Sequence, residues 1–343
     1  MKTILMGLAV LALFSACGGS LYQPGSAAEE VPRVSGSVSG TEGYITVNEG
    51  IQLYWFAQGN GEPVLMIHGG PGYPFKDAWE GLETLAGGYR FIYYHQRGCG
   101  RSTRPIDRFT GKNYGENLAV LESALGLTTQ LRDIEAFRIA LGVDTLTLIG
   151  HSYGGFLASL YAAEYPDRVK NLILIAPAEV LRMPMKHSEG LYGSVRDRLP
   201  AEKREGFDSF MKRFFDYGRI FEKSERELQE LNREFIRYYT LAYGGGVPEE
   251  NLYDTSDIAG WGQHALFFST GQRYDLSGQM EKIRAKTLIL TGTADLASET
   301  EILETYGRIP GFEHRRLEAG HFPFEENSDD FAGVVAGFLG GGV

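Results

Sequence analysis

The chain has 343 residues, a formal net charge of −11 and two cysteines. This acidic balance argues against nucleic acid as a partner, and two cysteines cannot build a framework of several disulfides. No Cys/His cluster has the spacing of a zinc site, and no phosphate-binding glycine fingerprint follows a strand pattern. We therefore expect neither a metal nor a cofactor.

The N-terminus has the pattern of an export signal. After a positive start, Ile4–Phe14 is an apolar run too short to span a bilayer as a helix. The sequence Phe-Ser-Ala-Cys that ends at Cys17 is typical of a lipoprotein cleavage site. Residues 1–16 are therefore predicted to be a signal peptide, Cys17 the lipidated residue, and residues 17–42 a tether that is rich in Gly, Ser and Ala at its start. The expected location is the bacterial cell envelope; an ordinary secretory signal, and hence a secreted protein, is the alternative.

Short apolar runs with strand character recur along residues 43–178 and return in 278–343, so these two stretches are predicted to form one α/β core. The expected strands are Gly43–Asn48, Gln52–Gln58, Pro63–Ile67, Arg90–His95, Asp144–Ile149, Asn171–Ala176, Lys286–Thr291 and His314–Leu317. Residues 179–277 lack such runs. They are charged, aromatic and helical in period, and they predict an inserted cap.

One glycine-flanked serine stands between a predicted strand and a predicted helix. The strand Asp144–Ile149 is followed by Gly-His-Ser-Tyr-Gly at residues 150–154, and Phe156 begins the helical pattern. A strand, a sharp Gly-x-Ser-x-Gly turn and a helix form the nucleophile elbow, which exposes the serine oxygen above the sheet. Ser152 is therefore the predicted nucleophile. Because a chain with 45 glycines can show this pattern by chance, other residues must supply the partners.

Two partners follow in the order used by hydrolases with such an elbow. Asp295 comes just after the predicted strand Lys286–Thr291, and His321 comes shortly after His314–Leu317. A free serine hydroxyl is a weak nucleophile, so it needs a base. We expect His321 to take and return the proton, and Asp295 to hold the imidazole tautomer. The alternatives are an ordinary turn aspartate and a structural histidine.

A glycine-rich loop, His68–Gly72, follows the predicted strand Pro63–Ile67. This is the position of the loop that donates an oxyanion-hole N–H in such enzymes. Glycine lets the backbone approach a substrate, and Pro71 stiffens the turn. The predicted donors are the N–H groups of Gly70 and of Tyr153, the residue after the nucleophile. A plain turn is the alternative.

These motifs resemble those of the prolyl iminopeptidases within the α/β-hydrolase superfamily. The hallmark His-Gly-Gly-Pro-Gly stands at residues 68–72, and the family's Gln-Arg-Gly-x-Gly-x-Ser segment stands at residues 96–102. The resemblance covers roughly residues 44–178 and 280–340. It implies an α/β-hydrolase fold: a mostly parallel eight-stranded sheet flanked by helices, with a mainly helical cap at 179–277. It also implies an aminopeptidase whose cap carboxylates hold the substrate's free amino group.

Three departures from the family pattern concern substrate recognition. His95 stands where the family has aspartate, and the elbow has His151 and Tyr153 where these enzymes commonly have Gly and Trp. The cap also lacks the Trp-Glu pairing that many of them use. Glu230 is the best match for an amino-group ligand, and it lies in a charged helical stretch that is otherwise expected to face solvent.

The sequence thus predicts a serine hydrolase that acts through an acyl-enzyme. The first choice is an aminopeptidase that releases an N-terminal residue, with proline as one candidate, from short peptides. A carboxylesterase or lactonase with the same triad and a non-catalytic surface-binding lipoprotein are the alternatives. The expected partner is a small peptide or ester, with membrane contact only through the N-terminal lipid. The oligomeric state is not indicated.

Overall fold

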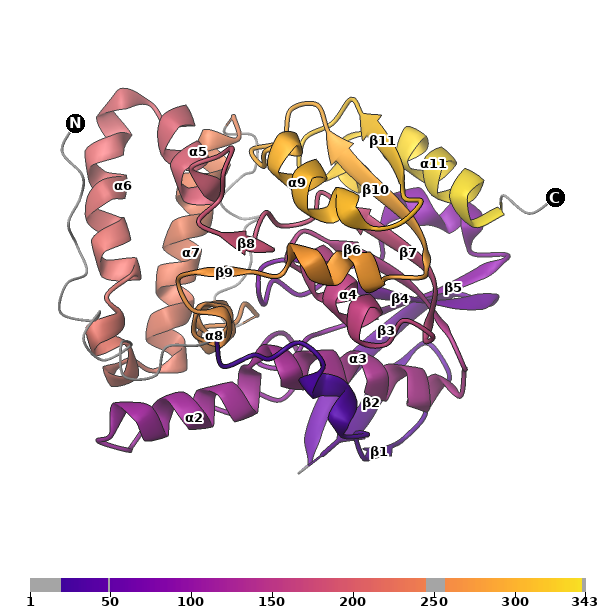
Figure 1. Ribbon diagram of the computed structural model, residues 1–343, viewed down its shortest axis with the longest axis horizontal. Coiled ribbons are helices and arrows are strands. Elements are labelled where there is room, and N and C mark those ends of the chain that lie inside the picture. Colours follow the sequence, from indigo (N-terminus) through magenta and orange to yellow (C-terminus); the bar gives the residue numbers. More distant parts are fainter. Residues whose placement is uncertain (1–19, 49, 245–256, 341–343) are drawn as a thin grey trace.

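A nine-stranded, mostly parallel sheet forms the centre of the computed structural model, which describes residues 20–48, 50–244 and 257–340 (Figure 1). Its order is β1-β2-β3-β5-β4-β6-β7-β10-β11. The ladders from β5 through β4, β6, β7 and β10 to β11 are parallel, and those joining β1, β2, β3 and β5 are antiparallel. The strands are β1 (Val34–Ser35), β2 (Glu42–Val47), β3 (Ile51–Gly59), β4 (Glu62–Ile67), β5 (Tyr89–Tyr94), β6 (Leu146–His151), β7 (Val169–Ile175), β10 (Lys286–Gly292) and β11 (Glu313–Leu317).

The eight strands expected from the sequence are present, and β1 is the ninth. It pairs with the outer side of β2 through the register Val34↔Val47. A strand of two residues is too short to show an alternating pattern, so the sequence could not predict it. The fold is otherwise the α/β-hydrolase fold that the motifs implied.

Both faces of the sheet are buried, which explains why its strands read as continuous apolar runs. In β6, Leu148 packs into the core on one face and Ile149 into the core on the other. The helices on the first face are α3 (Leu127–Leu141), α4 (Tyr153–Glu164), the 3₁₀ helix η5 (Ser277–Lys282), α9 (Glu299–Thr305) and the short η6 (Tyr306–Arg308). Those on the second are the 3₁₀ helix η2 (Glu80–Leu85), α10 (Pro323–Glu326) and α11 (Ser328–Gly340).

The N-terminal segment packs against the folded core from residue 20 onward, so the prediction that residues 17–42 form a tether is wrong for its described part. Tyr22 is 1% exposed, its hydroxyl hydrogen-bonds Glu164, and its backbone N–H donates to Ser269 O at 2.9 Å. Ala27 is fully buried in the short 3₁₀ helix η1 (Ser26–Glu29). Composition suggested flexibility, but partners distant in sequence fix this segment.

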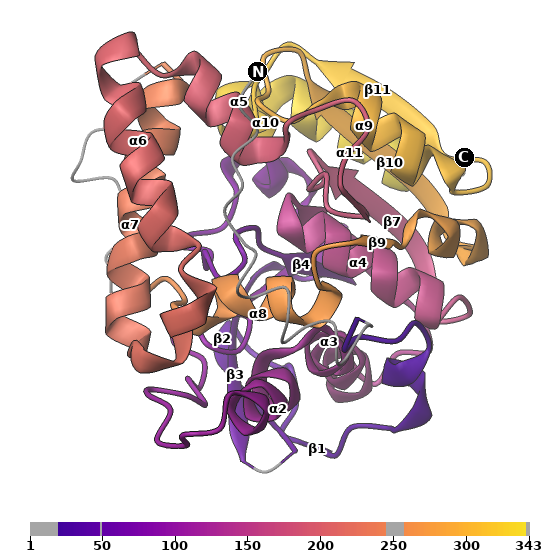
Figure 2. The ribbon, with the colours of Figure 1, turned by 60° about the vertical axis from the view of Figure 1, so that its left-hand side comes forward.

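A mainly helical cap lies beside the sheet, and Figure 2 shows its two longest helices side by side. The cap helices are α5 (Gly190–Arg198), α6 (Ala201–Phe214), the 3₁₀ helix η3 (Tyr217–Glu222), α7 (Glu225–Ala242) and α8 (Trp261–Thr270). A small ribbon of β8 (Arg182–Met183) and β9 (Tyr274–Asp275) pairs the chain that enters the cap with the chain that leaves it. The helix α2 (Tyr114–Leu125) extends from the core and packs on α8. Among the described residues, no helix is both long and apolar enough to cross a membrane.

Candidate active site

Ser152 sits on a strained turn between β6 and α4. Its backbone has φ 54° and ψ −120°, a conformation that L residues rarely adopt. A Cβ on Gly154 would collide with the carbonyl oxygen of Ile67, and one on Gly150 would collide with that of Gly154. Both positions therefore require glycine. The turn is held by Ser152 N–H donating to Ile175 O at 2.9 Å, and the serine remains partly exposed.

Asp295 and His321 meet at the same edge of the sheet. Asp295 lies in the turn after β10, and His321 lies in the loop after β11. His321 Nδ1 is 2.9 Å from Asp295 Oδ2 and 3.0 Å from Oδ1. The two side chains are only 13% and 5% exposed, respectively. The predicted acid–histidine pair is thus in contact and shielded from solvent.

The contact between Asp295 and His321 shifts the pKa of both side chains. Burial by itself would lower the pKa of His321, but the charge and hydrogen bond of Asp295 outweigh it and raise that pKa. Burial would raise the pKa of Asp295, whereas His321 and the N–H of Ala297 stabilise the carboxylate and the net shift is downward. Asp295 is therefore anionic at neutral pH, and it favours a protonated His321.

His151 and Glu326 both hydrogen-bond the backbone of the His321 loop. His151 Nε2 donates to His321 O at 2.8 Å, and the two rings are 4.8 Å apart. Burial lowers the pKa of His151 to about 3, so its imidazole is neutral. Glu326 accepts from Gly320 N at 2.7 Å and from Phe322 N at 3.0 Å. The elbow residue His151 thus connects Ser152 to the loop that carries His321.

Ser152 and His321 are brought to neighbouring positions, but no hydrogen bond joins Ser152 Oγ to His321 among the described residues. In enzymes without substrate the contact between nucleophile and base is often long and tightens on binding. The link between the two residues in the structure runs through His151, which directly precedes Ser152 and donates to His321 O.

The glycine-rich loop lies directly against the nucleophile. A Cβ on Gly69 would be 3.1 Å from Ser152 Cβ, and Gly70 has φ 123°, which favours glycine. Among the described residues, neither Gly70 N nor Tyr153 N has a hydrogen-bond acceptor. Two unsatisfied N–H groups flanking Ser152 are suited to bind a developing oxyanion.

A rigid framework supports this loop. His68 Nε2 accepts from Gln96 N at 3.0 Å, and Gln96 Nε2 donates back to His68 O at 2.7 Å. His95, the departure from the family pattern, accepts Arg101 N on Nδ1 at 3.0 Å and contacts Phe75 O through Nε2 at 3.0 Å. A carboxylate could accept the same N–H, so histidine can replace aspartate here without losing that contact.

The structure contradicts the assignment of Glu230 to substrate binding. Its side chain is 53% exposed, and its nearest cation is Arg226 at 3.7 Å on the same helix. The buried face of α7 carries Glu225, Gln229 and Asn232 instead. Glu225 is fully engaged, since it accepts Gly260 N and Trp261 N at 2.8 Å each. The error arose because a charged helix does not reveal which face is covered. Cys17, the predicted lipidation site, lies outside the described residues.

Glu179, a buried carboxylate that acts on the Asp295–His321 pair, was not predicted from the sequence. It is 5% exposed, and it follows the carboxyl end of β7, next to β10. Its position after a buried strand is the same signal that identified Asp295, so it could have been found. Glu326 was also missed, because its role depends on backbone N–H groups that have no sequence signature.

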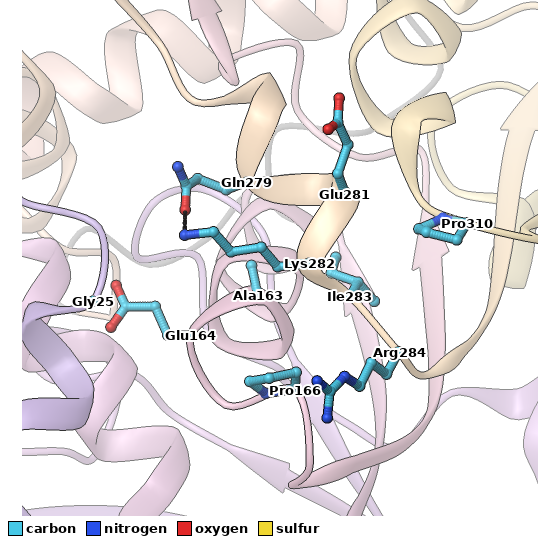
Figure 3. A pocket seen from close by; sticks show the side chains of 10 residues that line it. All are labelled: Gly25, Ala163, Glu164, Pro166, Gln279, Glu281, Lys282, Ile283, Arg284 and Pro310. Carbon is cyan, nitrogen blue, oxygen red and sulfur yellow. Dashed lines mark hydrogen bonds between the residues drawn. The ribbon is translucent and has the colours of Figure 1, made fainter.

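A separate pocket lies at the C-terminal end of α4, whereas Ser152 precedes the N-terminal end of this helix (Figure 3). It has a volume of about 740 Å³, lies between the end of α4 and η5, and includes none of the triad residues. Its charged groups are already paired: Lys282 with Gln279 at 2.7 Å, Arg284 with Asp167 at 2.6 Å, Glu281 with Arg308 at 3.2 Å, and Glu164 with the N-terminal segment. The pocket therefore offers no unpaired group for catalysis.

Comparison with known proteins gives the same fold and a related peptidase. A family model described as the alpha/beta hydrolase fold matches residues 62–328. A proline iminopeptidase of Clostridium botulinum is 30% identical over 316 residues, which cover 87% of this chain and 98% of the relative. A proline iminopeptidase of Clostridioides difficile is 27% identical over 319 residues, with the same coverage.

Solved structures with different chemistry share the fold. A proline iminopeptidase of Mycobacterium smegmatis superposes with a TM-score of 0.59 at 20% identity, covering 88% of this chain and 98% of that one. An esterase from Exiguobacterium antarcticum gives 0.56 at 21% identity, covering 88% and 100%. An enol-lactonase from Burkholderia xenovorans gives 0.55 at 18% identity, covering 87% and 100%. The fold is therefore common to enzymes that cleave peptides, esters and lactones.

Proposed function

The chain belongs to the α/β-hydrolase fold family as a proline iminopeptidase-like hydrolase, and we propose that it forms an acyl-enzyme on Ser152. The observation that carries the proposal is the buried Asp295–His321 pair beside a serine on a strained elbow. In the proposed mechanism His321 Nε2 takes the hydroxyl proton of Ser152 as its oxygen attacks the substrate carbonyl. The N–H groups of Gly70 and Tyr153 stabilise the oxyanion.

The same histidine completes both halves of the reaction. In the first half His321 passes the proton to the leaving amine or alcohol, and the acyl group stays on Ser152. In the second half a water molecule gives its proton to His321 and attacks the acyl carbon; the bond from this carbon to Ser152 Oγ then breaks as His321 returns the proton to that oxygen. Asp295 remains anionic throughout and stabilises the imidazolium.

The proposed substrate class is a short peptide with a free N-terminus, from which one residue is released. Two relatives named proline iminopeptidase, at 30% and 27% identity and matched along 98% of their length, support this choice. The exposure of Glu230 favours a second candidate, a carboxylesterase or lactonase, because it removes the cap carboxylate assigned to the amino group.

The Ser152→Ala variant tests the enzyme proposal. Loss of the nucleophile is expected to lower kcat by several orders of magnitude on arylamides and esters alike, with the thermal unfolding midpoint unchanged. A fluorophosphonate probe is expected to label wild-type Ser152 and not the variant. A folded wild-type protein that the probe does not label would favour a binding module instead.

A comparison of free and N-acetylated substrates tests the peptidase proposal. Pro-, Ala- and Leu-arylamides are measured beside their acetylated forms and short acyl esters. An aminopeptidase loses activity on acetylation, because the site no longer meets an ammonium group. Equal turnover of free and acetylated arylamides, or turnover of esters alone, would support the esterase or lactonase.

We also propose that Cys17 carries a lipid. Ser20 already contacts Ser269 of α8 through its hydroxyl at 2.7 Å, so only Gly18 and Gly19 separate the lipidated residue from the folded protein. The Cys17→Ser variant is expected to move the protein from the membrane fraction of its host to the soluble fraction. A wild-type protein found only in the soluble fraction would contradict the anchor.

A further inference from the structure

Glu179 links the cap to the catalytic turn. It follows β7, just before the ribbon strand β8 from which the chain enters the cap. Its Oε1 accepts Ser298 N at 2.8 Å and lies 3.1 Å from Ser188 Oγ. Ser298 belongs to the turn that begins at Asp295, and Ser188 lies just before the first cap helix, α5. One buried carboxylate thus contacts both parts of the site.

Glu179 and Asp295 bind consecutive N–H groups of the same turn. Ala297 N donates to Asp295 Oδ1 at 3.0 Å, and Ser298 N donates to Glu179 Oε1 at 2.8 Å. This arrangement keeps the two carboxylates close to each other and to His321. At such range in a shielded site, a charge on one group changes the proton affinity of the others.

Within the part of the chain that the structure describes, Glu179 differs from the other buried carboxylates because it has no cationic partner. Asp133 is paired with Arg97 at 2.5 Å, and Glu301 is paired with Arg182 at 2.6 Å. Among the described residues, no Lys, Arg or His side chain lies within 4.0 Å of the Glu179 carboxylate. A buried carboxylate without a cation is expensive to ionise. The imidazolium of His321 is a cation on which this carboxylate acts, since Glu179 raises the pKa of His321.

We propose that Glu179 is a positioning residue of the catalytic centre whose negative charge stabilises protonated His321, and so sets the pH at which this base becomes available. The inference rests on the proposed function, since it requires His321 to act as the base for Ser152. Glu179 acts through the turn of Asp295 and through its charge, and it does not touch the reacting atoms.

The charges around these two groups support this role. Glu179 faces Asp295 and Glu301, and burial, the largest effect, raises the pKa of Glu179 to about 7. His321 faces Asp295, Glu326 and Glu179, each of which raises its pKa against the effect of burial, and His151, which is neutral. Two interacting groups lose their protons in coupled steps. The acid limb of kcat/KM is therefore expected to be broad in the wild type.

Glu179→Gln separates the charge from the hydrogen bonds, because the glutamine oxygen can still accept Ser298 N and Ser188 Oγ. Removal of an anion lowers the proton affinity of His321, so the acid limb is expected to move to lower pH. We expect a shift of about half a pH unit to one unit and a limb that fits a single step. At the plateau kcat is expected to fall by about three- to tenfold, because the imidazolium loses a stabilising charge. An activated ester serves as substrate, so the measurement does not depend on amino-group recognition.

Ser188→Ala is the matched control, since it removes the cap-side hydrogen bond and keeps the charge. Its acid limb is expected to coincide with that of the wild type. An unchanged limb in Glu179→Gln, or an equal shift in Ser188→Ala, would overturn the proposal. So would a Glu179→Gln variant that changes only KM for free-amine substrates, because Glu179 would then bind the substrate.

A measurement on the wild type keeps the proposal testable if Glu179→Gln does not fold. NMR titration of the His321 imidazole is expected to show two inflections, one of them from the neighbouring carboxyl, and a single inflection would refute the coupling. Failure of the proposed function has a different signature: a Ser152→Ala variant that keeps its ester activity. That result would show that His321 is not the base for Ser152, and the role proposed for Glu179 would then be refuted as well.

Discussion

Replacing Asp295 with asparagine is expected to favour the tautomer of His321 that cannot take the proton of Ser152. Ala297 N–H donates to Asp295 Oδ1 at 3.0 Å, and it requires an acceptor at that position. In Asp295→Asn the amide oxygen therefore takes the place of Oδ1, and the amide NH₂ takes the place of Oδ2. That NH₂ group faces His321 Nδ1 at 2.9 Å and can only donate. This NH₂ group favours the tautomer in which His321 accepts at Nδ1 and carries its proton on Nε2, the nitrogen that should receive the proton of Ser152; the amide oxygen, 3.0 Å from Nδ1, can accept only from the other tautomer.

The expected loss follows from this change of tautomer. In a serine protease the same substitution lowers kcat by about 10⁴, which corresponds to about 5.5 kcal/mol of transition-state stabilisation. Ground-state binding does not use the pair, so KM should change little. Asp295 carries a lowered pKa, so its stabilisation is present above its unfolded value of about 3.9 and is lost as pH falls. His321 carries a raised pKa, so its stabilisation is present below about 6.5 and is lost as pH rises. The variant should therefore be least stable, relative to wild type, between roughly pH 4 and 6.5.

Stopped-flow turnover of an activated ester gives kcat and KM separately, and thermal unfolding at pH 5 and pH 8 gives the stability change. A kcat within tenfold of wild type would refute the assignment of Asp295, because the orienting role would then belong to another carboxylate. A larger destabilisation at pH 8 than at pH 5 would refute the sign of the linkage.

Two further substitutions test the parts of the molecule where the structure corrected the sequence. Tyr22→Ala removes a ring that is 1% exposed and leaves Glu164 without its phenol partner, so we expect a loss of about 3–4 kcal/mol in the free energy of unfolding. Leu21→Ala is the control, because its side chain is 41% exposed and its removal should change the free energy of unfolding little. Equally small losses in both variants would support the flexible tether predicted from the sequence. Glu230→Gln should leave KM unchanged for free-amine arylamides and esters, because the carboxylate is 53% exposed and pairs with Arg226 of its own helix. A rise in KM for free amines alone would return Glu230 to the substrate site.

The departures from the family pattern have different consequences in the structure. His95 preserves a contact with Arg101 N that a carboxylate could make, so this replacement leaves the support of the oxyanion loop intact. His151 adds a contact, since its ring holds the carbonyl of His321. Within the described part of the cap, Glu225 of α7 accepts Gly260 N and Trp261 N, and Asn232 of α7 donates to Ala259 O. Recognition of a free amine must therefore be tested by experiment.

The elements that carry the chemistry were predictable because their signals are local. The elbow at Ser152 needs glycine at fixed neighbours, and strands buried on both faces read as apolar runs. Asp295 and His321 each follow such a run, and parallel strands bring their carboxyl ends to one edge. Short-range sterics and burial therefore determined these positions, and the structure confirms that Asp295 and His321 are in contact.

Only the tertiary structure determined the burial and the charge around groups whose neighbours are distant in the sequence. Tyr22 is ordered because Glu164 and Ser269 lie beside it, although its own neighbours have a flexible composition. The sequence could not show that Glu230 is exposed and Glu179 is buried, because a carboxylate does not indicate which element covers it. The proton affinity of His321 likewise depends on charges that arrive from other loops. Burial and electrostatics are set by packing between elements, whereas the pattern along the chain records only the elements themselves.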